Sequence, residues 1–444
     1  MADSDPRLAN RILAGLAVGA AAGGLTLIGG GVFPPLLQGA RWLAVFVLDP
    51  LGQVFLRMLF FVVIPLVFAS LAAGIAQLGE LRRLGPLAAR TFTLFLLNMG
   101  IAVALGLLMM NVIAPGEAID EATQTRLVAE YGGAAQRHIE RQAAAPALTP
   151  MTVVDMFMPR NLFGAFVGSD RNTLGEILPL ILFAVLVGAA GTQFPPDQRR
   201  RLQSGLEMLT GLMTGIVHLA LRLAPYAVPA LIFSVVVKIG WDILVALGVF
   251  VLGCLGVLLL HLFGTMSLWL RLFTRFGPLE FWRRIRPVLV TAFSTSSSSA
   301  TLPAALASAR EDLAIRPTTA GFVLPLGTTM NMAGTALYEG CVVLFVAQVF
   351  GIGLGLAHQV TLLLLAVLSA VAVAGIPGGS LPLIAGLLMS FGIPPEGIGI
   401  VLGADRLLDM TRTMVNVGAD MVTTAVVDAW EDEGGTAARP AAGP

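Results

Sequence analysis

Five polar residues within one apolar segment near the end of the chain are the first candidates for chemistry. Residues 403–427 form a segment long enough to cross a bilayer as one helix, yet it contains Asp405, Asp409, Arg412, Asn416 and Asp420. At about 100° per residue, these five side chains fall within about 80° of arc on that helix. Polar groups gathered inside a membrane in this way typically mark a substrate or ion pathway.

The energetic cost of this polar stripe limits what it can face. A charge at mid-membrane costs about 2.5–3.5 kcal/mol, so four charges facing lipid would cost about 10–14 kcal/mol. The stripe must therefore face protein, water or a ligand. A buried network of ion pairs that only joins helices remains the alternative to a binding site.

The composition is that of an all-α protein that crosses the membrane many times. The chain has 444 residues, of which 56% are hydrophobic and only 12% are charged. The formal net charge is zero, which gives no reason to expect a nucleic-acid partner. Cys254 and Cys341 both lie in apolar segments and indicate neither a disulfide framework nor a metal site.

The apolar segments and the basic loops between them predict the topology. Arginines gather in every second loop, which places those loops and both chain termini in the cytoplasm. The mixed-charge loop 114–150 falls on the outer side and is expected to be irregular, and the tail 431–444 is expected to be disordered. The expected spans are 11–31, 43–77, 88–113, 151–192, 204–237 and 242–270.

The second half of the chain contains two broken apolar segments that predict re-entrant hairpins. The first, at about 278–310, has the Ser/Thr-rich sequence TSSSSATLP at residues 295–303. The second, at about 358–391, is interrupted by AGIPGG at residues 374–379, and neither of its arms is long enough for a comfortable crossing. Non-helical backbone at this depth requires surrounding protein or water.

A polar-interrupted helix follows each hairpin. The sequences TMNMAG (329–334) and TMVNVGA (413–419) resemble each other, and Asn331, Gly334 and Thr335 suggest an unwound point within the first helix. Corresponding interrupted segments in two halves of a chain predict inverted repeats with a binding site between them near the middle of the membrane.

Together these motifs resemble the dicarboxylate/amino-acid:cation symporter family, which has the glutamate-transporter fold. The resemblance covers nearly the whole chain and is most specific from residue 291 to residue 427. It implies eight transmembrane helices and two re-entrant hairpins, assembled as a homotrimer. It also implies that residues 1–240 divide mainly between a trimerisation scaffold and part of a transport core, and that residues 241–430 supply most of that core. The core would move across the membrane as a near-rigid body, which is called an elevator mechanism.

The resemblance also assigns roles to individual residues. Arg412 matches the arginine that holds the substrate's side-chain carboxylate, for which the forked guanidinium is suited, and Asp409 matches the aspartate that binds the ammonium group. Asp405 matches a carboxylate behind the substrate site. The other substrate contacts would come from Thr413, Asn416 and Thr335, and from the backbone at Ser298 and Ile376 in the two hairpin tips.

For the coupling cation, the sequence both matches and departs from the family. One sodium site is matched by Gly327, Asn331, Asn416 and Asp420, and Glu339 stands where animal glutamate carriers have their proton-accepting glutamate. The aspartate of the family's NMDGT motif is Ala333 here, and the polar pair of the third helix appears as Asn98 and Met99. These losses remove oxygen ligands that sodium requires. An apolar environment also favours the neutral form of the Glu339 carboxyl group, so both features favour proton coupling. A mixed proton and sodium carrier stays open.

Further departures concern the tip of each hairpin and an additional arginine of the family. Where the family has a threonine in the second hairpin, this chain has Val373. The loss of that hydroxyl weakens another sodium site. The additional arginine is absent, since Ser296 and Met410 occupy its two known positions, and Arg406 is a possible substitute that points in a different direction on its helix.

The sequence therefore predicts a secondary-active symporter in the plasma (inner) membrane that imports glutamate or aspartate with protons, sodium or both, and that needs no cofactor beyond a possible sodium ion. The main alternative is a C4-dicarboxylate carrier, although Asp409 would repel a second carboxylate. A neutral amino-acid carrier would not need Arg412. An anion channel or sensor on the same fold is less consistent with polar residues that converge on one site, and no nucleophile–base pair suggests an enzyme.

Overall fold

The computed structural model describes residues 6–81, 86–119, 124, 158–167, 177–240, 242–373 and 380–436. Within these residues the chain forms helices and turns and no strand, which confirms the predicted all-α class. Most of the loop 114–150 and the tip of the second hairpin lie outside the described residues.

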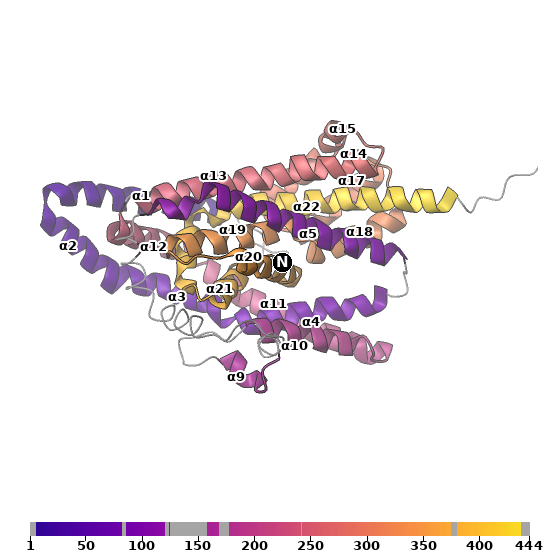
Figure 1. Cartoon of the computed structure of the whole chain (residues 1–444), viewed down its shortest axis with the longest axis horizontal. Coiled ribbons are helices and arrows are strands. Elements are labelled where there is room, and N and C mark those ends of the chain that lie inside the picture. Colours follow the sequence, from indigo (N-terminus) through magenta and orange to yellow (C-terminus); the bar gives the residue numbers. More distant parts are fainter. Residues whose placement is uncertain are drawn as a thin grey trace, which may run out of the picture.

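The first half of the chain contributes long helices that are broken at several points (Figure 1). A π-helical turn at Ala44–Leu48 joins α2 to α3, and α11 ends just before Pro225 and Pro229 of α12. The bounds are α1 Pro6–Val32, α2 Pro34–Leu43, α3 Asp49–Phe61, α4 Val63–Leu81, α5 Pro86–Ile113, α9 Leu162–Val167, α10 Ile177–Gly191, α11 Pro196–Leu221 and α12 Ala224–Ile239.

The second half begins with α13, which continues through a π-helical turn, η4, into α14, and ends with the longest helix, α22. Figure 1 shows α5, α13 and α22 running along the longest axis of the molecule, with α9 and α10 at the opposite edge from α13. The bounds are α13 Asp242–Leu260, η4 His261–Thr265, α14 Met266–Phe273, α15 Pro278–Arg284, α16 Arg286–Thr295, α17 Ser298–Glu311, α18 Pro317–Met330, α19 Ala333–Val349, α20 Leu356–Ala372, α21 Leu381–Ser390, the 3-10 turn η5 Pro395–Gly397 and α22 Ile398–Thr436.

The described residues include 6 helical stretches that are long and apolar enough to cross a membrane. They are Ala14–Val32, Pro34–Ala73, Leu87–Glu117, Pro196–Leu221, Asp242–Phe273 and Pro317–Val349. The last differs from the others because its whole apolar window is buried inside the protein. The count of eight transmembrane helices stays a prediction.

The helices pack in two groups. Helices α1, α3, α4, α10, α11 and α12 contact one another, whereas α5, α13, α19, α20 and α22 pack around α19. Although α5 comes early in the chain, it packs mainly with the second group, as expected if residues 1–240 divide between two parts of the molecule. The assignment of these groups as scaffold and moving core stays a prediction.

The first predicted hairpin consists of α16 and α17, which meet at Ser296 and Ser297. Ser296 has a positive φ of 51°, a left-handed conformation that an L residue adopts only where the turn demands it. Ser297 then begins the return helix, and its hydroxyl accepts a hydrogen bond from the backbone N–H of Ala300 at 3.2 Å. A serine-rich sequence thus supplies both the turn and the helix cap.

The interruption predicted near Asn331 lies between α18 and α19. Helix α18 ends at Met330 and α19 begins at Ala333, so that Asn331 and Met332 form a non-helical link within the membrane-spanning stretch. Gly334 allows α19 to approach α22 closely, because a Cβ atom at this position would lie 2.6 Å from the backbone oxygen of Arg412. The link therefore faces the polar stripe of α22.

The end of α22 differs from the prediction for the tail 431–444. The helix continues to Thr436, so the beginning of the expected disordered tail is helical, and residues 437–444 lie outside the described residues. The reason is that this end of the helix has partners. The Arg90 side chain pairs with Glu431 at 2.7 Å, and the Trp430 ring packs on Phe273 with centroids 5.7 Å apart.

Candidate functional site

The polar stripe of α22 forms a buried cluster of opposite charges. As predicted, residues 403–427 belong to one continuous helix. The Nη2 atom of Arg412 lies 2.7 Å from Oδ1 of Asp409 and 3.4 Å from Oδ1 of Asp405. Arg412 is only 2% exposed, and each of the two aspartates is 7% exposed. The cluster therefore pairs its charges inside the protein, which is the arrangement that a buried charge requires.

Two further residues hold the Arg412 side chain. Its Nη1 atom donates a hydrogen bond to Oγ of Ser380 at 2.8 Å, and its guanidinium carbon lies 4.1 Å from the centre of the Tyr338 ring. The Tyr338 hydroxyl donates to Oδ1 of Asp405 at 2.9 Å. Ser380 comes directly after the tip of the second hairpin, so Arg412 links α22, α19 and that hairpin.

A second arginine stands at the edge of the cluster. The Nη1 atom of Arg406 lies 3.7 Å from Oδ2 of Asp409, on the opposite oxygen from the one that Arg412 contacts. Asp409 thus lies between two guanidinium groups. Counting the two arginines against Asp405 and Asp409, the cluster has no net charge.

Asn416 caps the broken helix from a different element. Its Oδ1 atom accepts hydrogen bonds from the backbone N–H groups of Gly334 at 2.7 Å and Thr335 at 3.3 Å, in the first turn of α19. Its Nδ2 atom donates to the Thr335 hydroxyl at 3.1 Å. Helix N-termini have N–H groups without partners in their own helix, and here the side chain of α22 supplies the acceptor.

The other predicted substrate contacts lie near this cluster to different degrees. Thr413 is buried, but its hydroxyl donates to the backbone oxygen of Asp409 at 2.9 Å, within its own helix. Ser298 is buried at the start of α17, which contacts α22. Ile376 lies outside the described residues.

The predicted cation residues also come together. The Nδ2 atom of Asn331 donates to Oδ1 of Asp420 at 2.9 Å, and a side chain at position 327 would collide with the Asp420 carboxylate. Glycine at position 327 is therefore required by the close approach of α18 to α22. Asn416, the fourth predicted ligand, uses its oxygen to cap α19 in this state.

Glu339 is completely buried on α19. Its two carboxyl oxygens have no hydrogen-bond partner among the described residues, and the Ser369 hydroxyl of α20 faces the carboxyl without meeting the geometry of a hydrogen bond. Burying an unpaired charge is costly, so this environment suits a neutral carboxyl group better than a carboxylate.

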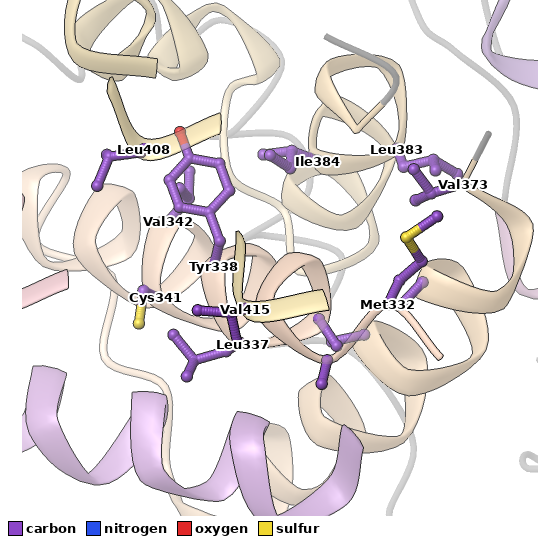
Figure 2. Packing of buried hydrophobic residues seen from close by; sticks show 14 of the residues in the cluster. Met332, Leu337, Tyr338, Cys341, Val342, Val373, Leu383, Ile384, Leu408 and Val415 are labelled. Atoms are coloured by element: carbon purple, nitrogen blue, oxygen red, sulfur yellow. The ribbon is translucent and has the colours of Figure 1, made fainter. Parts of the chain in front are cut away.

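Apolar side chains surround the polar groups. Figure 2 shows residues of α19, α21 and α22 converging with the ends of α18 and α20. The labelled residues are Met332, Leu337, Tyr338, Cys341, Val342, Val373, Leu383, Ile384, Leu408 and Val415, all of them buried. This packing excludes water and so strengthens the electrostatic interactions within the cluster.

The sequence analysis missed three residues that the structure places beside the predicted site. Tyr338 and Ser380 contact Arg412, and His261 contacts Asn98, the polar residue of the predicted pair that itself donates to Asn331. Tyr338 follows Thr335 at a spacing of one helical turn, which is a signal that sequence reasoning could have used. The contacts of Ser380 and His261 join distant segments of the chain, and no spacing indicates them.

Comparison with known proteins agrees with this architecture. The chain is 30% identical over 394 residues to the proton/glutamate-aspartate symporter of Escherichia coli K12, covering 88% of this chain and 86% of the relative. It is 31% identical over 425 residues to a proton/sodium-glutamate symport protein of Bacillus subtilis 168, covering 96% and 92%. It is also 30% identical over 390 residues to the C4-dicarboxylate transport protein of Brucella anthropi, covering 87% and 84%. Residues 8–430 match the model of the sodium:dicarboxylate symporter family, and the chain belongs to that family.

Proposed function

We propose that this protein is a secondary-active symporter that imports glutamate or aspartate together with protons, sodium or both. The observation that carries the proposal is the buried pair of Arg412 and Asp409, 2.7 Å apart. A ligand with both a carboxylate and an ammonium group complements a guanidinium beside a carboxylate. Two relatives, named as a proton/glutamate-aspartate symporter and a proton/sodium-glutamate symport protein, support the same substrate class.

A C4-dicarboxylate is the second candidate substrate, because Arg406 also reaches Asp409. Two guanidinium groups around one carboxylate reduce its repulsion of a second substrate carboxylate. The name of the Brucella relative supports this candidate. The amino acid is favoured because Asp409 remains the stronger partner for an ammonium group than for any part of succinate.

Counterflow of labelled glutamate in proteoliposomes tests the proposal. Unlabelled glutamate or aspartate inside the vesicles should drive accumulation of the label, whereas succinate and serine should not. In the Asp409→Asn variant, exchange of both amino acids should fall, because the partner of their ammonium group loses its charge. Exchange of succinate that exceeds exchange of glutamate in the parent protein would assign the dicarboxylate instead, and a channel would show no counterflow.

We further infer how the protein sits and moves. Apolar side chains such as Phe61, Val112 and Leu252 are 72–77% exposed and would contact lipid in the plasma (inner) membrane. The basic loops support cytoplasmic positions for both termini. The family resemblance supports a homotrimer and an elevator movement of the group around α19. Sites labelled with single cysteines on α16 and α20 would change sides of the membrane under this mechanism.

A further inference from the structure

Two buried polar side chains of α19 and α20 face each other without forming a hydrogen bond. The two carboxyl oxygens of Glu339 and the hydroxyl oxygen of Ser369 have no hydrogen-bond partner in the described part of the chain. Glu339 is 0% exposed and Ser369 is 3% exposed, and the two side chains interact where α20 packs against α19. A buried polar group without a partner costs about 1–3 kcal/mol, so the presence of both groups requires an explanation.

Ser369 interrupts an otherwise apolar face of α20. The buried residues of this helix recur at helical spacing, and its neighbours on the buried face are Leu362, Leu365, Ala366 and Ala370. Alanine at position 369 would continue this face without burying a polar atom. The packing of α20 therefore does not explain why the residue carries a hydroxyl group.

The hydroxyl of Ser369 is not used by its own helix. Serine and threonine inside helices often donate to the carbonyl oxygen four residues earlier, as Thr361 of α20 and Ser390 of α21 both do at 3.0 Å. Ser369 makes no such bond to the described residues of α20. Its donor therefore remains free for the Glu339 carboxyl group that it faces.

Arg412 of α22 is the charged side chain that acts on the Glu339 carboxyl group, and Asp405, Asp409 and Ser380 already engage it. The other elements packed against α19 carry few titratable groups. These are Arg90 of α5, Glu117 of η3, Asp242 and Cys254 of α13, His358 in the first turn of α20, the remaining charged residues of α22, and none in α21.

A serine hydroxyl stabilises a carboxylate more than it stabilises a neutral carboxyl group. A hydrogen bond that an O–H group donates to an ionised acceptor is about twice as strong as one between neutral groups. The bond is absent in this structure, which suits the neutral form of Glu339. Rotation of the Ser369 side chain or a small shift of α20 would bring the donor onto the carboxylate that forms when the proton leaves.

We propose that Ser369 is a positioning residue that promotes proton release from Glu339 by donating to its carboxylate. The inference rests on the proposed proton coupling and adds the partner of the proton carrier. Helix α20 is the first arm of the second hairpin, and Ser380, directly after the tip of that hairpin, contacts Arg412. The same hairpin thus contacts both the proton site and the substrate cluster.

The pH dependence of glutamate binding tests this role. Dissociation constants are measured by calorimetry on the purified protein from about pH 5 to about pH 9, at a fixed sodium concentration. If glutamate binds with a proton on Glu339, the constant rises above the pH at which the free protein loses that proton. Ser369→Ala removes the donor to the carboxylate, so this bend should move about one unit to higher pH, which is a tenfold gain in proton affinity.

Three variants make the result specific. Ser369→Thr keeps a hydroxyl group and should keep the bend of the parent protein. Ser369→Cys has a weaker donor, should shift the bend in the same direction as alanine, and serves as the test if the alanine variant does not fold. The matched control is Ser390→Ala, which removes a hydroxyl that donates within its own helix, in the second arm of the same hairpin, and should leave the bend unchanged.

The outcomes separate the role of Ser369 from the function on which it rests. Glu339→Gln should remove the bend. With that result, a shift in Ser369→Ala to lower pH or of less than about half a unit, or an equal shift in Ser369→Thr, would overturn the role of Ser369 alone. A bend that persists in Glu339→Gln, or no bend in the parent protein, would overturn Glu339 as the proton carrier and Ser369 with it. Failure of glutamate counterflow would overturn the proposed function.

Discussion

Replacing Arg412 should separate acidic from neutral amino acids. The parent cluster contains two aspartates and two arginines, and Arg412→Ala leaves it with a net charge of −1 and with Arg406, at 3.7 Å from Asp409, as the remaining cation. Glutamate carries a net negative charge, so it loses a guanidinium partner and meets net repulsion. Serine has no side-chain carboxylate and no net charge, so its binding should change much less.

The magnitude follows from the burial of the pair. Arg412 is 2% exposed, and truncating one partner of a buried, hydrogen-bonded charge pair costs about 2–5 kcal/mol. At about 1.4 kcal/mol per factor of ten, glutamate binding should weaken by about 30-fold to about 4,000-fold. Arg412→Lys keeps the charge but loses the fork and the contact with the Tyr338 ring, so its loss should be smaller.

Calorimetric titration of the purified variants with glutamate, aspartate and serine measures this difference. Gel filtration and circular dichroism establish that each variant is folded, and Arg412→Lys serves as the test if the alanine variant is not. A dissociation constant for glutamate within threefold of the parent value in Arg412→Ala would refute the assignment. Equal losses for glutamate and serine would show that the site collapsed and that Arg412 does not discriminate between them.

Three other changes have defined outcomes. Glu339→Gln should abolish uptake driven by an inward proton gradient in choline buffer, measured with labelled glutamate in proteoliposomes; uptake that still follows the gradient in choline would exclude Glu339 as the proton carrier. Asn416→Ala should leave two N–H groups of α19 without acceptors and lower Tm, at a cost of about 1–3 kcal/mol for each group; an unchanged Tm would contradict the cap. Burial raises the pKa of Glu396 in the turn η5, only partly opposed by Arg57, so the folded protein binds the proton more tightly than the unfolded chain and stability falls as pH rises above about 4.5. Glu396→Gln should therefore raise Tm at pH 7 but have little effect at pH 4, and a gain that is the same at both pH values would contradict this reasoning.

Much of the fold could be predicted because burial leaves few choices for polar groups in apolar segments. The stripe from Asp405 to Asp420 required one helix with its polar side facing protein, and the structure has that helix. The break near Asn331 was likewise predictable, because polar residues and glycine interrupt an otherwise apolar stretch. These features depend on local spacing, which the sequence contains directly.

The pairing of distant residues could not be predicted in the same way. Asn416 was assigned to the substrate and to a cation, but its oxygen accepts from the N-terminus of α19. That contact depends on how closely α19 and α22 approach, which Gly334 permits but no periodic pattern specifies. His261 appeared only as one of four histidines in the sequence, and its contact with Asn98 arises from the packing of η4 beside α5.

The internal hydrogen bonds of the site determine how a ligand would gain affinity. Arg412 already donates to Ser380 and Asp409, Asn331 donates to Asp420, and Asn416 is fully engaged at α19. A ligand must exchange these bonds for its own, so the net gain per contact is small and a substrate that fails to replace one of them loses affinity sharply. Glu339 differs, because its carboxyl group has no such bond to exchange among the described residues. The simplest response open to such a group is a change of its protonation state. We therefore propose that the stripe of α22 discriminates between substrates and that Glu339 of α19 carries the proton.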